Sequence, residues 1–352
     1  LAGGNTSYGT ITNGYWDTTT AAVATGIGSN SGTITGGGGL ATAQLTAALP
    51  SGFSSATWGN IGNQTTPYLL ANASFDTYSG SVLLGIDTSA TPAPYKVINN
   101  VTQLQNINST GLNLNYVLGN SIDASATASW NSGAGFAPLG SNANPYQGIF
   151  DGLGYTISNL TINRGGNYIG LFGDSGGTIR NIGLVGGSVS GDASSYAVGA
   201  LAGGNAGTIS NAYATTAVSG YRAVGGLVGF NASTIDNAHA TGLVNGSYLV
   251  GGLVGVNAGT VTGVYATGNV NGQHNIGGLV GSNSNGTGTA TIDNAYATGS
   301  IVGATNVGGL VGQNSSGTIS NAYATGNDAA RGIGVVEDRK STRLNSSHIT
   351  IS

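Results

Sequence analysis

Apolar residues recur along the second half of this chain in short groups separated by glycine, asparagine and threonine. The most regular group is built around a leucine, as in Gly252-Leu-Val-Gly255. Its leucines are 26 residues apart at Leu201, Leu227, Leu253 and Leu279, and Leu310 follows 31 residues later. The longer interval contains a polar run between Asn283 and Thr289, which we interpret as a loop insertion. A period of about 20 to 50 residues predicts a solenoid, a propeller or an array.

Each repeat contains three parts. The first is the Gly-Gly-Leu-Val-Gly segment, whose Leu and Val we expect in the core and whose glycines permit close approach of the backbone. An Asn-x-Gly turn signal follows it, as at Asn257 to Gly259. The second part is Thr-Ile-x-Asn-Ala-Tyr-Ala-Thr-Gly, as at Thr291 to Gly299, and the third is a short apolar strand, as at Val270. The predicted structural motif consists of Gly226, Leu227, Val228, Gly229, Gly252, Leu253, Val254, Gly255, Gly278, Leu279, Val280, Gly281, Gly309, Leu310, Val311 and Gly312.

The pattern predicts an all-β fold, a parallel β-solenoid (parallel β-helix) with coils of about 26 residues. Stacked coils place equivalent residues about 4.8 Å apart, so like residues should form ladders along the axis. We expect an internal aliphatic ladder of Ile179, Ile209, Ile235, Val261, Ile292 and Ile319. We expect a corner ladder of hydrogen-bonded amides at Asn181, Asn211, Asn237, Asn294 and Asn321, interrupted by Gly263. An outer or half-buried face should carry an aromatic ladder of Tyr213, His239, Tyr265, Tyr296 and Tyr323.

The chain before the repeats is less regular. Residues 1–20 are interpreted as the last coil of an upstream array, because Leu1 to Asn5 is repeated letter for letter at Leu201 to Asn205. The period is then lost over residues 21–95, which we interpret as a linker module. A short helix is predicted there over Leu40 to Leu49, because apolar residues at helical spacing precede a proline.

Residues 96–145 form the segment that leads into the second array, and the repeat solenoid is predicted over residues 146–330. Val101, Leu104 and Ile107 fall at helical spacing behind Asn99-Asn100, which can cap one or two helical turns. Tyr116 to Gly119 is typical of a strand. Such an amphipathic piece would cover the edge that the first coil otherwise exposes.

The end of the sequence departs from the repeat. Residues 338–352, DRKSTRLNSSHITIS, resemble the conceptual translation of a sequencing-library adapter, and our hypothesis is that they are not native. We therefore assign no function to His348, Arg339, Lys340 and Arg343.

Composition narrows the classes of function. The chain has 352 residues, of which 65 are glycine, none is cysteine and 6% are charged. The lack of cysteine excludes disulfides and thiolate metal ligands, and we expect neither a metal nor a cofactor. A formal charge of −4 with eight basic residues argues against nucleic-acid or anionic-lipid partners. No apolar run reaches about 18 residues, so we predict no insertion into a membrane.

Residues 146–326 resemble the GLUG repeat, named for the core seen here as Gly226-Leu-Val-Gly229 and its equivalents. Tyr15-Trp-Asp17, Gly39 to Leu45 and Phe150 to Leu160 resemble segments that accompany such repeats in filamentous-haemagglutinin-like exoproteins. The resemblance implies a large, secreted bacterial adhesin on the surface of a Gram-negative cell, exported by two-partner secretion. Its implied partners are an outer-membrane transporter and an unknown host or cell-surface receptor or glycan.

Parallel β-helices also include polysaccharide lyases and hydrolases, so we considered carboxylate sites. Asp236 and Asp293 occupy equivalent positions two coils apart, about 10 Å by the coil spacing, which suits an inverting carboxylate pair. The position between them is Thr262, which favours a solvent-facing site without catalysis. We expect Asp151 to form an Asx turn in Phe-Asp-Gly.

The two histidines of the repeats have simpler interpretations than a catalytic role. His239 should be a variant rung of the aromatic ladder, and His274 should lie in a turn. No His-Glu-x-x-His protease motif is present in the sequence.

Two threonine columns suggest a remote alternative from another class, an ice-binding solenoid. They are Thr215, Thr241, Thr267, Thr298 and Thr325, and Thr208, Thr234, Thr260, Thr291 and Thr318. Threonine is also simply a good strand residue. The sequence therefore predicts a non-catalytic structural or adhesive solenoid, with a carbohydrate-active β-helix as the main alternative.

Overall fold

The computed structural model describes residues 2–5, 10–17, 27–31, 33–47, 50, 58–59, 68–69, 95–284, 290–326 and 328–330. The chain divides into two compact units, Leu1–Lys96 and Val97–Ser352. The second unit contains the repeats. The segment predicted to be non-native, Asp338–Ser352, lies outside the described residues.

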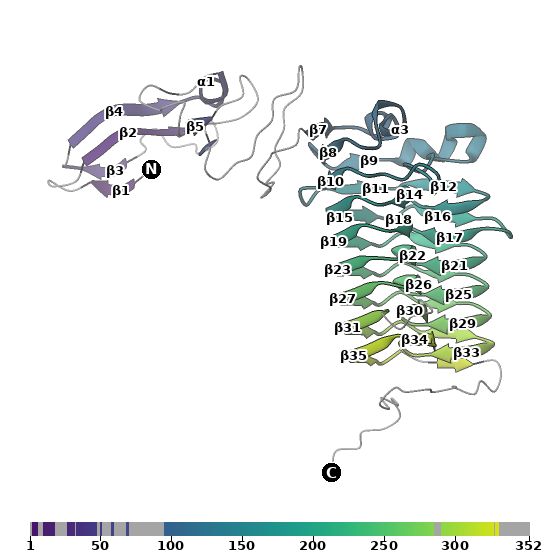
Figure 1. Cartoon of the computed structure of the whole chain (residues 1–352). Helices are drawn as coiled ribbons and strands as arrows, with labels where there is room; N and C mark the ends of the chain where they lie inside the picture. The colour runs from purple at the N-terminus through teal and green to yellow at the C-terminus, as the bar shows by residue number, and fades with distance from the viewer. Residues whose placement is uncertain are drawn as a thin grey trace, which may run out of the picture. The chain divides into compact units, whose positions relative to one another are not determined.

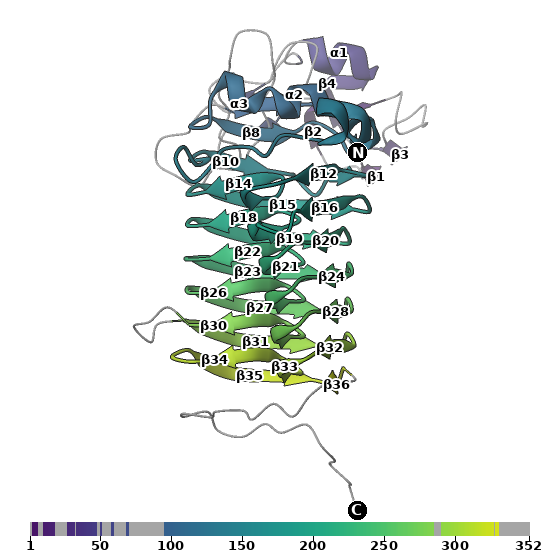
Figure 2. The same cartoon turned by 90° about the vertical axis from the view of Figure 1, so that its right-hand side faces the viewer.

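The second unit is a parallel β-solenoid of about six turns with coils of about 27 residues, which confirms the predicted fold class (Figure 1). Its strands stack into four sheets of 11, 7, 6 and 6 strands that run along the solenoid. Figure 2 shows the same stack from the side. From Thr178 to Asn314, each coil contributes one strand to each sheet, so a residue meets its equivalents in the coils before and after it.

The first sheet contains β7 (Tyr95–Ile98), β8 (Asn115–Leu118), β9 (Ile122–Asp123), β10 (Ile149–Asp151), β11 (Thr156–Ser158), β15 (Thr178–Val185), β19 (Thr208–Ala214), β23 (Thr234–Ala240), β27 (Thr260–Ala266), β31 (Thr291–Ala297) and β35 (Thr318–Ala324). The second contains β12 (Thr161–Arg164), β16 (Ser188–Gly191), β20 (Ala217–Ser219), β24 (Val244–Asn245), β28 (Val270–Asn271), β32 (Ile301–Gly303) and β36 (Asp328–Ala330). The third contains β13 (Asn167–Ile169), β17 (Tyr196–Gly199), β21 (Arg222–Gly225), β25 (Tyr248–Gly251), β29 (His274–Gly277) and β33 (Thr305–Gly308). The fourth contains β14 (Phe172–Ser175), β18 (Ala202–Asn205), β22 (Val228–Asn231), β26 (Val254–Asn257), β30 (Val280–Asn283) and β34 (Val311–Asn314).

The leucines of the repeat motif form a single buried file. The backbone N–H of Leu227 donates to the carbonyl of Leu253 at 2.9 Å, and Leu253 donates to Leu279 in the same way. Leu201, Leu227, Leu253 and Leu279 are all fully buried. The aliphatic ladder predicted from Ile179 to Ile319 is likewise in register from coil to coil. The core therefore consists of stacked columns of like residues.

The glycines of the motif are required by close packing of backbone on backbone. A Cβ on Gly255 would overlap the backbone of Ala223, and a Cβ on Gly252 would overlap the carbonyl of Gly278. Neither obstacle is a flexible side chain that could move away. The recurring glycines thus set how closely successive coils pack on each other.

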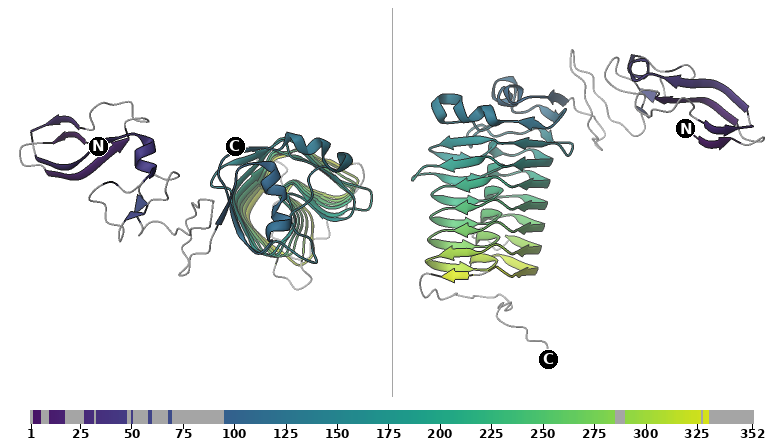
Figure 3. Two further views of the ribbon diagram at one scale, coloured as in Figure 1. Left: turned by 90° about the horizontal axis from the view of Figure 1, so that it is seen from above. Right: turned by 180° about the vertical axis from the view of Figure 1, so that it is seen from behind.

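The first coil of the solenoid is covered by short helices (Figure 3). They are α2 (Val101–Gln105), α3 (Ile107–Thr110) and the 3-10 segment Ser125–Gly133. Asn100 caps α2 by accepting a hydrogen bond from the backbone N–H of Gln103 at 2.9 Å, as its position in the sequence predicts. Val101, Leu104 and Ile107 are buried and extend the core of the solenoid. The amphipathic spacing in the sequence therefore correctly predicted that this segment covers the first coil.

The first unit contains coil-like pairs of its own. β1 (Ala2–Asn5) pairs in parallel with β3 (Ile27–Asn30), and β2 (Thr10–Asp17) pairs in parallel with β4 (Thr33–Leu40). Strands of residues 1–20 therefore pair with strands of the segment that we interpreted as a linker module. The residues after 20 lack the Gly-Leu-Val-Gly signal, but Thr10-Ile-Thr12 recurs at Thr33-Ile-Thr35, and these like residues pair in register.

Two shorter pieces complete the described part of this unit. The helix predicted over Leu40 to Leu49 forms as α1 (Thr42–Ala47). β5 (Trp58–Gly59) pairs with β6 (Tyr68–Leu69) as an antiparallel pair.

Candidate functional site

The long strands of the first sheet bend at a column of asparagines. Asn181, Asn211, Asn237, Asn294 and Asn321 all adopt positive φ angles between 47° and 53°. Gly263 takes the same place with φ 63°. Asparagine and glycine are the residues that adopt this left-handed conformation most readily. Gly263 therefore keeps the bend of the backbone and removes only the side chain.

The amides of this column hydrogen-bond along the axis, as predicted. Asn211 donates from Nδ2 to Oδ1 of Asn181 at 3.1 Å, and Asn237 donates to Asn211 at 2.5 Å. Beyond the gap at Gly263, Asn294 and Asn321 donate instead to the carboxylate of Asp293. The predicted ladder is thus confirmed for its first three members.

The aromatic ladder is a continuous stack of rings. Neighbouring centroids from Tyr213 to Tyr323 are 5.1, 4.4, 4.9 and 5.3 Å apart, and the planes differ by at most 8°. The rings are half-buried except for the last, Tyr323, which is 55% exposed. His239 is a rung of this stack, as expected, and burial lowers its pKa below the ordinary value for histidine.

The ladder ends at its N-terminal side beside a shallow pocket. The register partner of Tyr213 in the preceding coil is Gly183, and the ring of Tyr213 lies where a side chain on Gly183 would be. The pocket has a volume of about 470 Å³ and is lined by Leu153, Gly154, Asn181, Ile182, Gly183, Asn211 and Tyr213. It combines one aromatic ring, aliphatic side chains and two amides. The sequence reasoning missed it, although a glycine in a column of aromatic residues was a visible signal.

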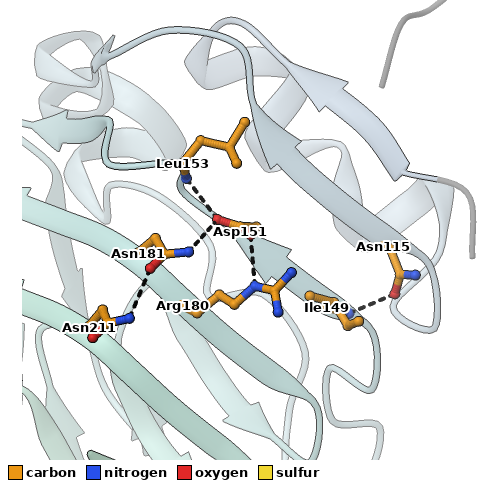
Figure 4. Close-up of polar contacts among 7 residues, drawn as sticks. All are labelled: Asn115, Ile149, Asp151, Leu153, Arg180, Asn181 and Asn211. Atoms are coloured by element: carbon orange, nitrogen blue, oxygen red, sulfur yellow. Dashed lines mark hydrogen bonds and ion pairs between the residues drawn. The ribbon is translucent and has the colours of Figure 1, made fainter. Parts of the chain in front are cut away.

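A buried ion pair lies next to this pocket (Figure 4). Asp151 accepts hydrogen bonds at Oδ1 from the backbone N–H of Leu153 at 2.8 Å and from Nδ2 of Asn181 at 3.0 Å. Its Oδ2 accepts from Nε of Arg180 at 2.7 Å. The bond to Leu153 confirms the predicted Asx turn. The bond to Arg180 was not predicted, although Arg180 is the register partner of Asp151.

The two candidate catalytic carboxylates lie on one column, as predicted. Asp236 pairs with Thr262, and Thr262 pairs with Asp293 in the next coil. Asp236 is exposed. Asp293 accepts hydrogen bonds from Oγ of Ser320 at 2.6 Å and from Nδ2 of Asn321 at 3.0 Å. These bonds, that from Ser320 first, lower the pKa of Asp293, so this carboxyl group is ionised near neutral pH.

His274 lies in a different place from the one expected. It is the first residue of β29 and not part of the preceding turn. Its ring stacks on Tyr248 with centroids 4.7 Å apart, and its Nδ1 lies 2.6 Å from Oγ1 of Thr305. The turn signal Asn-Gly-Gln ends one residue earlier because the strand pairing of β29 with β25 begins at His274.

A second asparagine ladder is hidden in the core. Nδ2 of Asn205 donates to Oδ1 of Asn231 at 2.8 Å, and the same bond joins each further pair of neighbours in the column Asn205, Asn231, Asn257, Asn283 and Asn314. Asn257 was interpreted only as part of a turn signal. The regular spacing of these residues was the signal that would have identified the ladder.

The threonine columns are also in register. Thr208, Thr234 and Thr260 pair in successive coils. The other column is exposed throughout, at Thr215, Thr241, Thr267, Thr298 and Thr325. Within the described ranges, no group of three His, Asp or Glu side chains gathers at a place that could hold a metal ion. No helix among the same residues is long and apolar enough to cross a membrane.

The family model of the GLUG motif matches residues 220–245, 246–271, 272–302 and 303–328. Four GLUG motifs are present. They begin and end within the solenoid, and each spans about one coil. The GLUG resemblance is therefore confirmed over these residues. The relation to filamentous haemagglutinins and two-partner secretion stays a prediction.

Two curated proteins resemble parts of the chain. "Halomucin" from Haloquadratum walsbyi is 43% identical over 139 residues, which cover 36% of this chain and 2% of that protein. A "Putative Gly-rich membrane protein" from Evansella cellulosilytica is 46% identical over 82 residues, which cover 22% of this chain and 10% of that protein. The matched segment is thus a small part of each relative.

One solved structure has a similar fold. The crystal structure of "a putative immunoglobulin A1 protease" from Bacteroides ovatus matches with a TM-score of 0.53 and 23% sequence identity. The match covers 74% of this chain and 82% of that chain. At this identity the likeness shows the fold alone.

Proposed function

We propose that this chain is a structural and adhesive segment of a large extracellular surface protein, and that it acts without catalysis. The observation that supports the proposal is the repetition of the aromatic ladder and of the exposed threonine column through successive coils. A surface that repeats along an axis offers the same contacts at many points, which suits multivalent attachment. A stack of short coils also extends a chain away from a surface by simple addition of repeats.

We infer an extracellular location from the relatives and the composition. One relative is named a membrane protein, and the absence of cysteine from the sequence agrees with an exported chain. The outer surface of a Gram-negative cell and a transporter of the two-partner type are the finer form of this proposal, and they depend on the resemblance to filamentous haemagglutinins.

The adhesive role is tested with beads coated with the full chain. We expect these beads to be retained on cultured cells or on immobilised surface polysaccharides, and beads coated with a Leu253→Asp variant, whose core is disrupted, to wash off. Equal retention of both coatings, or no retention on any of these surfaces, would contradict the adhesive proposal.

The main alternative is a carbohydrate-active enzyme, and the shared column of Asp236 and Asp293 favours it. Incubation of the chain with polysaccharides should release no new reducing ends if the chain is not catalytic. Release that falls in Asp236→Asn or Asp293→Asn would support the enzyme instead.

The exposed threonine column favours the remote alternative, an ice-binding solenoid. A thermal-hysteresis assay tests it, since Thr267→Lys would interrupt a regular ice-facing column. Hysteresis that is absent, or unchanged in this variant, would exclude that function.

A further inference from the structure

The N-terminal end of the aromatic ladder differs from every interior rung. Tyr265 is stacked between His239 and Tyr296, so both faces of its ring are covered. Tyr213 stacks on His239 alone, because its register partner in the preceding coil is Gly183. The ring of Tyr213 therefore borders the pocket instead of another ring.

The walls of the pocket next to this ring are apolar on one side. Leu153 is 38% exposed and lies in the turn after the buried Asp151. Gly154 contributes no side chain to the pocket, and the ring of Tyr213 lies over the backbone of Gly183. Leu153 and the ring of Tyr213 thus give the pocket an apolar part.

The other side of the pocket carries amides with unused hydrogen-bonding capacity. A side-chain amide has two N–H donors and a carbonyl that can accept two hydrogen bonds. Asn211 uses one donor on Asn181 and one acceptor site for Asn237. One donor and one acceptor site of Asn211 therefore remain, close together and exposed. Such a pair matches neighbouring hydroxyl groups, each of which can donate and accept.

The pocket offers no unpaired charge. None of its lining residues is ionisable except the phenol of Tyr213. The nearest carboxylate, Asp151, is only 4% exposed in its side chain and is paired with Arg180. A charged ligand would therefore lose hydration without gaining an ionic partner.

We propose that this pocket binds a neutral saccharide. The apolar C–H face of a pyranose ring packs on the ring of Tyr213 and on Leu153, and its hydroxyl groups bond to the amides of Asn211 and Asn181. The pocket volume of about 470 Å³ accommodates a short saccharide and not a long one. This inference rests on the proposed adhesive function and names the class of ligand at one point of the surface.

The test uses the full chain and defined probes. Trisaccharides of glucose, galactose and N-acetylglucosamine are titrated by isothermal calorimetry, with trigalacturonate as the anionic counterpart. We expect at least one neutral trisaccharide to bind and trigalacturonate to bind at least tenfold more weakly. Absence of binding by every neutral probe, or preference for trigalacturonate, would overturn the proposal.

Matched variants locate the site. Tyr213→Ala should weaken saccharide binding about tenfold or more, whereas Tyr265→Ala, which removes an interior rung, should bind as the parent does. Asn211→Gly keeps the bend, as Gly263 does in its own coil, and should weaken binding, while Asn237→Gly should not. Equal losses in Tyr213→Ala and Tyr265→Ala, with both variants folded by circular dichroism, would place the binding elsewhere and overturn the assignment.

Failure of the pocket assignment can be distinguished from failure of the proposed adhesive function. If coated beads adhere and Tyr213→Ala beads adhere equally while free saccharides do not bind, the pocket assignment is wrong and the adhesive function stands. If free saccharides bind at Tyr213 but coated beads adhere to nothing, the pocket stands and the adhesive function fails.

Discussion

The side chain of Asn257 donates a 2.8 Å hydrogen bond from Nδ2 to Oδ1 of Asn283, and both residues are fully buried. Each interior member of this column, Asn231, Asn257 and Asn283, donates to the next coil and accepts from the previous one. Buried amides without partners are costly, so the column is stable only while the coils remain stacked in register. The ladder thus specifies the register as well as contributing to stability.

Asn257→Ala should destabilise the solenoid by about 2 kcal/mol or more, because it leaves the amide of Asn231 without its acceptor and Asn283 without its donor. Urea unfolding followed by circular dichroism measures the effect. Asn237→Gly, at an exposed position, is the matched control, and it should lower the free energy of unfolding by less than half as much. A smaller loss for Asn257→Ala than for the control would contradict the structural role of the inner ladder.

Leu253→Asp should unfold the repeat unit, since it places a carboxylate in a fully buried column of leucines. Thr262→Asp should be tolerated at a loss of only about 1 kcal/mol, because carboxylates already occupy this column at Asp236 and Asp293 and only their repulsion opposes the change. Thermal unfolding of the two variants checks this pair. Similar melting of both variants would contradict the register.

Gly263→Asn should be neutral or stabilising. Its φ of 63° suits asparagine, and a Cβ there would meet its nearest atom, the backbone N of Asn237, at 3.5 Å, which is an ordinary contact. Gly263→Val should cost about 1 to 2 kcal/mol, because a β-branched residue disfavours this conformation. Melting temperatures of the two variants should therefore move in opposite directions or at least differ clearly. A Val variant as stable as the Asn variant would show that the bend is not required.

The stability of the solenoid should depend on pH through His239. Burial lowers the pKa of His239, so the folded chain binds fewer protons at this residue than the unfolded chain does. Stability is then fully present above the unfolded pKa of about 6.5 and falls as the pH drops from there through the folded pKa. His239→Tyr, which restores the residue type of the other rungs, should reduce the loss of melting temperature between pH 7 and pH 5. An unchanged pH dependence in this variant would exclude His239 as its source.

Much of the fold could be predicted because the coils repeat. Once Leu227 and Leu253 are aligned, every other residue of the two coils is aligned as well, and the aliphatic, aromatic and outer asparagine ladders follow. The helix behind Asn100 was predictable for a local reason, since capping and helical spacing depend only on neighbours in sequence. The parallel pairing after residue 20 was not predicted, although Thr10-Ile-Thr12 recurs at Thr33-Ile-Thr35 and pairs with it in register.

The candidate site was less predictable because it lies where the repetition fails. Gly183 and the pair of Asp151 with Arg180 occupy the first coils, which depart from the repeat. The structural role of these residues depends on which side chains of the neighbouring coil lie beside them. A glycine in the column signals a missing ring, but only the position of Leu153 and of the amides makes that gap a pocket.

The sequence by itself determined the period, the all-β class and the identity of the residues that stack, because one alignment of like residues describes every pair of coils. Only the tertiary structure decided which of the two asparagine columns is buried and which is exposed. That choice depends on the left-handed bends at residues such as Asn211 and Gly263, which reverse the inward and outward alternation within a strand. Asn237 lies at such a bend and is exposed, whereas Asn257 lies in another sheet and is buried, although the two columns look alike in the sequence.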